Sequence, residues 1–118
     1  MSFIWTLEDQ PDHLLVRAEG QWQLQGIFRL LDEAARRCRD AGYGRVLIDA
    51  RNVTGPLAEI SRYAAGARVA EVLRGIRVAV LAHPDTVITG FGVRVAASRG
   101  GRLFVTKSED EARQWLFE

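Results

Sequence analysis

The chain has 118 residues, of which 47% are hydrophobic and 26% are charged, and its formal net charge is +1. These values are typical of one globular domain with a hydrophobic core of its own. They exclude an electrostatic attraction to nucleic acid, and no apolar run approaches the length of a membrane span. Cys38 is the only cysteine. An intrachain disulfide is therefore excluded, and the absence of a signal-like N-terminal stretch predicts a cytoplasmic protein.

The first two predicted elements are strands. Phe3, Trp5 and Leu7 share one face of the first, which is typical of a half-buried strand. Turn residues follow, and a second strand is predicted over Leu14–Ala18. A connection this short requires antiparallel strands, so we expect an N-terminal hairpin.

Helices and strands alternate in the middle of the chain. From Leu24 the apolar residues follow helical spacing, and Gly42 ends this helix. A short apolar strand is predicted over Arg45–Asp49, and a second helix over Pro56–Arg74. Another apolar strand is predicted over Ile76–Leu81.

The last third repeats this alternation. A third helix is predicted to begin at Asp85 or Thr86. A strand over Arg102–Val105 and a helix with a capping box at Ser108 follow. The order ββαβαβαβα predicts an α/β fold with four helices and a five-stranded mixed sheet that begins with an antiparallel hairpin, in one domain over residues 1–118.

Four stretches together point to a known fold family: RVLIDARNVTGP, SRYAAGARVAEVLRGIRVAVLA, VAASRGGRLFV and EARQWL. Their order resembles the STAS domain of anti-anti-sigma factors and looks most similar to the stand-alone bacterial SpoIIAA-like proteins. The resemblance implies a SpoIIAA-like fold and a non-enzymatic regulatory domain that binds a protein partner. It also implies a relationship to CRAL-TRIO domains, which hold lipids.

The turn after the third strand is where the resemblance places a regulatory site. Partner-switching STAS proteins carry a phosphorylatable Ser there, in an Asp-Ser-Ser-Gly-Leu type turn at a helix N-terminus, where added negative charge is favoured. Here the turn reads VTGPL, so the Asp-Ser-Ser residues are missing, and this argues against a phosphorylation switch. The turn and the following helix still form the predicted partner-binding or regulatory surface. Its candidate residues are Asp49, Arg51, Asn52, Thr54 and Ser61.

The second helix is unusually rich in small residues. Small side chains let a helix lie close against a sheet or another helix, and this is the simpler interpretation. They could also leave a cleft between the second and third helices that admits a small apolar or lipid-like ligand. The residues predicted to line that cleft are Ile60, Tyr63, Phe91 and Val95.

No residue pattern predicts catalysis. Asp49 follows a buried strand, where open α/β sheets often bind ligands, but an Asp there also hydrogen-bonds the amides of the next turn. His13 and His83 have neither metal-ligand spacing nor a nucleophile nearby, and we expect both in surface loops. We therefore predict no catalytic residue, no metal and no cofactor.

Self-association is a second possible mode of partner binding. Trp22 follows the hairpin, and an edge strand offers unpaired main-chain groups to another chain. If Trp22 is exposed beside that edge, the sequence predicts a homodimer formed through it.

Overall fold

The computed structural model describes residues 2–118, and its elements follow the predicted order. The strands are β1 (Phe3–Asp9), β2 (Leu14–Gln21), β3 (Arg45–Thr54), β4 (Arg77–Ala82) and β5 (Arg102–Thr106). The helices are α1 (Leu24–Ala41), α2 (Glu59–Val72), α3 (Phe91–Ser98) and α4 (Glu109–Phe117). The predicted α/β class and element order are confirmed.

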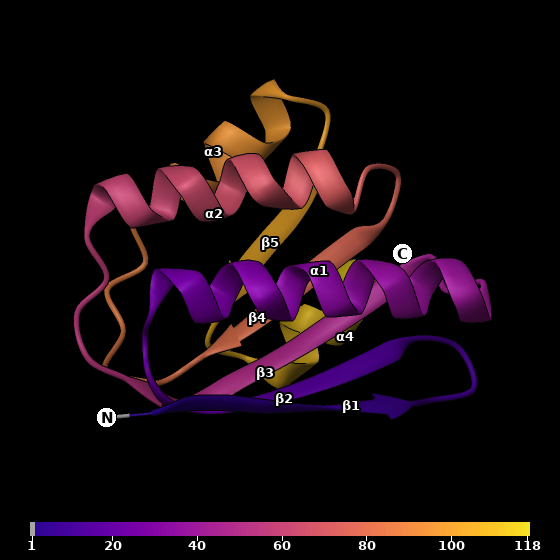
Figure 1. Ribbon diagram of the computed structural model, residues 1–118, viewed down its shortest axis with the longest axis horizontal. Helices are drawn as coiled ribbons and strands as arrows, with labels where there is room; N and C mark the ends of the chain where they lie inside the picture. Colours follow the sequence, from indigo (N-terminus) through magenta and orange to yellow (C-terminus); the bar gives the residue numbers. More distant parts are fainter. Residues whose placement is uncertain (1) are drawn as a thin grey trace.

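The five strands form one mixed sheet in the order β1-β2-β3-β4-β5. β1 and β2 pair antiparallel as the expected hairpin, and every other neighbouring pair is parallel because a helix lies in each crossover. α1 and α2 lie side by side over one face of this sheet (Figure 1). α4 packs against the other face, through Ala112 and Leu116. The hairpin therefore forms one edge of the sheet, and the sheet lies between two helical layers.

The core follows the alternation of side chains along β3. Val46, Ile48 and Ala50 belong to the main core, under α1 and α2, while Leu47 belongs to the smaller cluster under α4. Successive side chains of a strand point to opposite faces, so β3 is buried on both sides. Within residues 2–118, no helix combines the length and the hydrophobicity needed to cross a membrane.

β3 is longer than predicted. The expected end at Asp49 is wrong, because the strand continues to Thr54. The pairing shifts by one extra residue in β3 opposite Arg17–Glu19 of β2, and beyond this point Asn52 pairs with Glu19 and Val53 pairs with Gly20. Polar residues after Asp49 resemble a turn in sequence, but the extended end of β2 supplies their hydrogen-bonding partners. Asp49 therefore lies inside a strand and not at its end.

α3 begins later than predicted. Its N-cap is Gly90, in the left-handed conformation with φ of 76°, and its first residue is Phe91. The predicted start at Asp85 or Thr86 is wrong, and residues 83–90 form a loop, called here the 83–90 loop. Four consecutive residues of this loop, Thr-Val-Ile-Thr, are β-branched and lose side-chain freedom in a helix. α2 likewise begins at Glu59 and not at Pro56, so two segments expected to be helical are loops instead.

α4 begins as predicted from its capping sequence. The Ser108 Oγ accepts a hydrogen bond from the Glu111 main-chain N–H at 3.2 Å. The reciprocal bond is made differently: the Ser108 N–H donates to the Thr106 Oγ1 at 3.1 Å, and that hydroxyl donates to Glu111 Oε1 at 3.1 Å. The Thr106 hydroxyl thus connects the two halves of the capping box.

Candidate functional site

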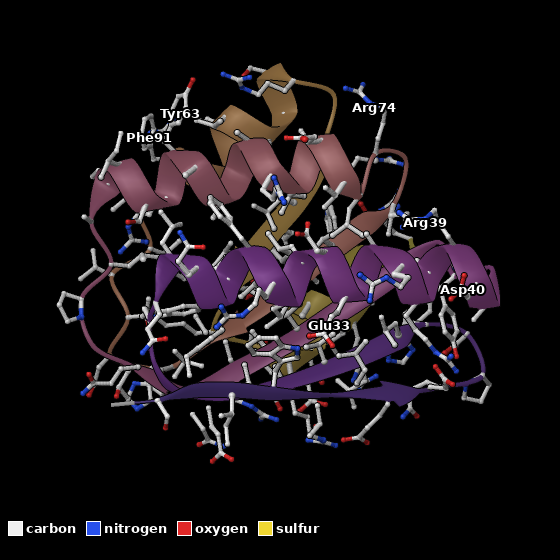
Figure 2. All side chains as sticks on the ribbon, viewed as in Figure 1. Glu33, Arg39, Asp40, Tyr63, Arg74 and Phe91 are labelled. Atoms are coloured by element: carbon white, nitrogen blue, oxygen red, sulfur yellow. The ribbon has the colours of Figure 1, made fainter. Side chains whose placement is uncertain are left out.

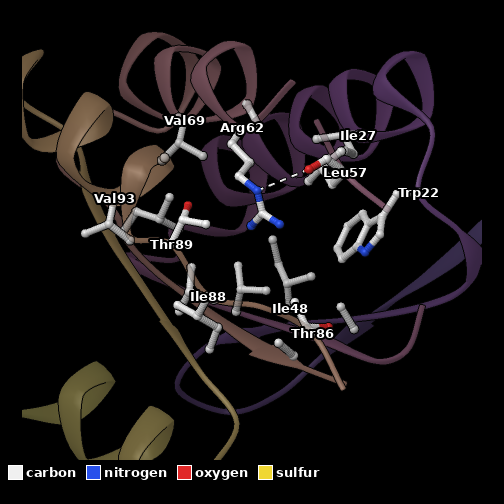
Figure 3. Close-up of a pocket in the computed structure, with 18 of the residues that line it drawn as sticks. Trp22, Ile27, Ile48, Leu57, Arg62, Val69, Thr86, Ile88, Thr89 and Val93 are labelled. Carbon is white, nitrogen blue, oxygen red and sulfur yellow. Dashed lines mark hydrogen bonds between the residues drawn. The ribbon is translucent and has the colours of Figure 1, made fainter. Parts of the chain in front are cut away.

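A cavity of about 540 Å³ lies between the sheet and the layer formed by α1 and α2 (Figure 3). Side chains of β3, β4 and β5 form its base, including Ile48, Val80 and Val105. Residues of α1 and α2 form its walls, and Pro56–Leu57 together with most of the 83–90 loop line the remaining side. Its volume is within the range of small-molecule binding sites, and most of its lining is apolar, as in such sites.

The cavity exists because the helical layer covers this part of the sheet incompletely. Val80 and Val105 point toward the helices but are only partly buried, whereas Val78 on the same face is fully buried. On the helix side, the small residues Ala65 and Gly66 of α2 line the cavity together with larger side chains such as Leu30 of α1. Loops, and not helical turns, lie beside the cavity at residues 55–58 and 83–90.

The 83–90 loop leaves apolar side chains at the opening of the cavity. Val87 is 70% exposed and Ile88 is 39% exposed, and both contribute to the lining. Ile60, at the start of α2, is also exposed, at 74%. Apolar side chains around a cavity opening are suited to contact with a ligand or another macromolecule.

Arg62 is the charged side chain whose guanidinium lies within the cavity (Figure 3). Its Nε donates a hydrogen bond to the main-chain oxygen of Leu57 at 3.2 Å and lies 3.0 Å from the Oε1 of Glu59. The sequence suggested Arg62 as one of several arginines that could gather at the rims of the second and third helices and attract a phosphate-bearing or acidic partner. Helical spacing adds that it lies on the inner face of α2. Arg62 precedes Gly66 by four residues and Val69 by seven, so it shares the buried face of α2.

The four residues predicted to line a cleft are not among the residues that line this cavity. Tyr63 and Phe91 lie together on the outer side of α2 and α3, away from the sheet, with ring centroids 6.0 Å apart (Figure 2). Arg99 lies over the Tyr63 ring. Ile60 points to solvent, and Val95 is buried.

The contact between α2 and α3 explains why the space lies elsewhere. The main chains of the two helices are in contact at Gly66 and Gly92, where a Cβ atom on Gly66 would overlap the main-chain oxygen of Gly92. The small residues of α2 therefore serve the close approach of two helices, as the simpler interpretation held. The expected cleft between α2 and α3 is replaced by a cavity on the sheet side of α2.

Asp49 and Arg51 lie on the opposite face of the sheet, near α4. The Asp49 carboxylate accepts hydrogen bonds from the Nε and Nη2 of Arg51, at 3.0 and 2.8 Å, and from the Arg51 main-chain N–H at 3.2 Å. Arg17 lies 3.6 Å away on β2, and Arg51 also reaches Glu109 of α4 at 3.4 Å. The hydrogen bonds from Arg51 hold the pKa of Asp49 below its ordinary value. Asp49 is thus an ionised member of a network that links β2, β3 and α4.

The remaining residues of the predicted regulatory surface are spread over the fold. Asn52 and Thr54 are exposed near the end of β3, and the main-chain oxygen of Thr54 accepts a hydrogen bond from the Trp22 N–H at 3.2 Å. Ser61 lies in the first turn of α2, on the other side of the sheet from the Asp49 network. Thr54 is separated from the start of α2 by four residues, so the two hydroxyls do not share a helix N-terminus.

Trp22 and His13 are more buried than the sequence suggested. Trp22 is partly buried, packs against Phe3 with ring centroids 5.9 Å apart, and lines the cavity. His13 is only 5% exposed and meets the ring of Phe117 edge-on at 5.5 Å, so its expected position in a surface loop is wrong. The C-terminal end of α4 covers the hairpin connection, a long-range contact that local sequence does not reveal. His83 is partly buried, and its Nδ1 accepts a hydrogen bond from the Asp85 N–H at 3.0 Å.

Comparison with solved structures identifies the architecture as the SpoIIAA-like, or STAS, fold. One similar structure is an anti-sigma factor antagonist from Mycobacterium paratuberculosis, with a TM-score of 0.63 and 14% identity over 99% of this chain and 96% of the other. Another is an uncharacterized protein of the DUF3478 family with a SpoIIAA-like fold from Shewanella loihica, with a TM-score of 0.52 and 20% identity over 97% of this chain and 93% of the other. No protein-family model matches the sequence, and no curated protein matches it. The fold recognised from the sequence is therefore confirmed.

Proposed function

We propose that this protein is a non-enzymatic regulatory domain of the STAS type that binds a small, mainly apolar ligand in the cavity under α1 and α2. The observation that carries the proposal is a cavity of about 540 Å³ inside a chain of 118 residues. Pockets of this volume with mostly apolar walls are typical of small-molecule sites. A ligand that fills this space would make contacts that the protein itself leaves unmade.

A regulatory role is supported by the fold and by the position of the cavity. The similar structure from Mycobacterium paratuberculosis is named as an antagonist of an anti-sigma factor, which is a protein partner. In the present chain the opening of the cavity is bordered by segments with exposed apolar side chains, such as Val87. A bound ligand would contact these segments from within and thereby change the surface presented to a partner.

Native mass spectrometry and calorimetric titration with decanol, a neutral apolar probe, test the proposal. We expect the purified protein to carry a bound small molecule or to bind decanol with one-to-one stoichiometry. Val80→Phe places an aromatic ring in the cavity, so this variant should lose binding while remaining folded. If the wild-type protein binds neither decanol nor any copurified molecule, or if Val80→Phe binds decanol as tightly as the wild type, the proposal is wrong.

Self-association through exposed apolar residues is a second candidate function. Ile60 and Val87 are 74% and 70% exposed, and large apolar side chains so exposed are suited to a protein interface. Sedimentation velocity of the wild type and of Ile60→Ser tests this surface. Ile4→Ser, at a position 53% exposed on the edge strand β1, tests the homodimer through the sheet edge in the same way. A wild-type protein that stays monomeric at high micromolar concentration would contradict both forms of self-association.

A further inference from the structure

The charge of the cavity comes from one side chain. Arg62 and Asp85 are the two charged residues among those that line it. The Arg62 side chain is 20% exposed, and its guanidinium points into the interior of the cavity (Figure 3). Asp85 is exposed and belongs to the 83–90 loop. Of these two residues, Arg62 is therefore the one whose charged group lies in the interior of the cavity.

The contacts of Arg62 leave one end of its guanidinium available. Nε is occupied, because it donates to Leu57 and lies beside Glu59. Neither Nη atom forms a hydrogen bond with any of residues 2–118, and both point away from the main chain of α2 (Figure 3). The Leu57 and Glu59 contacts also restrict the position of the side chain. A guanidinium fixed in this way offers two parallel N–H donors, a geometry that matches a carboxylate.

The surroundings of Arg62 favour an anionic partner. A charged group in apolar surroundings is costly unless it is paired and hydrogen-bonded. Glu59 provides part of the pairing, but its side chain is 58% exposed and it contacts Arg62 through Nε. The Arg62 guanidinium therefore has at most one unit of positive charge that a ligand could balance. A singly charged carboxylate matches that charge better than a doubly charged phosphate.

Beyond Arg62 the cavity continues over apolar side chains of the sheet, including Ile48 and Val80. At roughly 30 Å³ for each water-sized group, a cavity of about 540 Å³ holds on the order of ten to twenty such groups. We infer that the ligand is an amphipathic monocarboxylate, whose carboxylate is bound by the Nη atoms of Arg62 and whose apolar portion lies against the sheet. This inference rests on the proposed ligand-binding function and specifies the chemical class of the ligand.

Calorimetric titration of the full chain with decanoate and with decanol at neutral pH tests the inference. The two probes share an apolar chain and differ in the charge of the head group. We expect the wild type to bind decanoate about ten- to hundredfold more tightly than decanol, because a hydrogen bond between charged groups replaces one with a neutral group. Arg62→Met keeps most of the side-chain length without the charge, so it should weaken decanoate binding about ten- to hundredfold more than decanol binding and thereby remove this preference. Arg36→Met, at an exposed position of α1 outside the cavity lining, is the matched control and should keep the preference.

The outcomes separate this inference from the proposal on which it rests. If the wild type binds decanoate and decanol equally well, or if Arg62→Met weakens both alike, the ligand class is wrong although the cavity binds ligands. If neither probe binds, the proposed ligand-binding function fails as well. Thermal unfolding shows whether Arg62→Met is folded. If Arg62→Met does not fold, the ratio of the wild-type affinities for decanoate and decanol tests the ligand class without the variant.

Discussion

Gly66 in α2 and Gly92 in α3 place the main chains of two helices in direct contact. A Cβ atom added to Gly66 would overlap the main-chain oxygen of Gly92 and lie 3.0 Å from its carbonyl carbon. Main-chain atoms cannot rotate out of the way as a flexible side chain can. This contact fixes the spacing of α2 and α3, and Gly66 also contributes to the wall of the cavity.

We expect Gly66→Ala to destabilise the protein. Alanine favours a helix over glycine by up to about 1 kcal/mol, but overpacking typically costs about 1–3 kcal/mol. Because the neighbouring atoms are main-chain atoms, the second effect should prevail, and the free energy of unfolding should fall by about 1–2 kcal/mol in urea denaturation. Gly44→Ala is the control, since a Cβ at Gly44 would meet no atom within 4 Å. A Gly66→Ala variant as stable as Gly44→Ala would contradict the close contact.

The Asp49 network should make stability depend on pH in the acid range. The folded-state pKa of Asp49 is lowered, mainly by the hydrogen bonds from Arg51, relative to the ordinary value of 3.8. A carboxyl with a lowered folded-state pKa stabilises the protein above its unfolded-state value, and this contribution is lost as the pH falls from 3.8 through the lower folded-state pKa. Asp49→Asn should therefore lower the free energy of unfolding at neutral pH by about 1 kcal/mol, with little further loss in acid from this site.

Urea denaturation of the wild type and Asp49→Asn over a series of pH values measures this effect. Asp40→Asn removes the same formal charge from the exposed end of α1 and serves as the control. The stability difference between the wild type and Asp49→Asn should shrink as the pH falls below 3.8. A difference that stays constant across that range would show that the carboxylate charge contributes nothing.

Filling the cavity should affect stability differently from overpacking the core. Val80→Phe adds volume where space exists, so the free energy of unfolding should stay unchanged or rise. Val46 on β3 is fully buried and lies outside the cavity lining, so Val46→Phe should cost about 1–3 kcal/mol. Thermal and urea denaturation of the two variants compare them directly. Equal destabilisation by both would mean that the space beside Val80 cannot accept a larger side chain.

Cys38 should be unreactive toward thiol reagents while the protein is folded. It is 2% exposed on the buried face of α1, and burial raises the pKa of its thiol from 9.0 to about 11. The thiolate is the reactive form. Because the thiol is buried and mostly protonated at neutral pH, modification of Cys38 should be slow. Labelling with a disulfide reagent should be slow in buffer and complete in denaturant. Rapid labelling in buffer would place Cys38 at the surface or in a segment that opens readily.

Local sequence patterns were enough to predict most of the fold. Apolar residues alternate in Phe3–Leu7 and follow helical spacing from Leu24, because one side of each element faces the core. The burial of Cys38 and the cap at Ser108 follow from the same short-range regularities. Their order along the chain was enough to predict the class of sheet, because a helical crossover makes the strands that it joins parallel.

The candidate site was predicted less well, because its residues come from distant segments of the chain that meet only in the folded structure. The end of β3 depends on how far β2 extends, and the Asp49 network depends on Glu109, sixty residues further along the chain. The position of the cavity depends on where α2 and α3 touch. The β-branched run before Gly90 was a local signal against an early start of α3, and the residues of this run line the cavity.

The sequence alone determined the order of the elements, the mixed sheet and the small-residue helix, because short-range periodicity and turn chemistry are sufficient for these features. Only the tertiary structure decided that the small residues of α2 would contact α3 and that space would remain on the sheet side. It also decided that Arg62 would point into that space. The physical reason is that a cavity is a volume that side chains from distant segments fail to fill. No single segment contains that information.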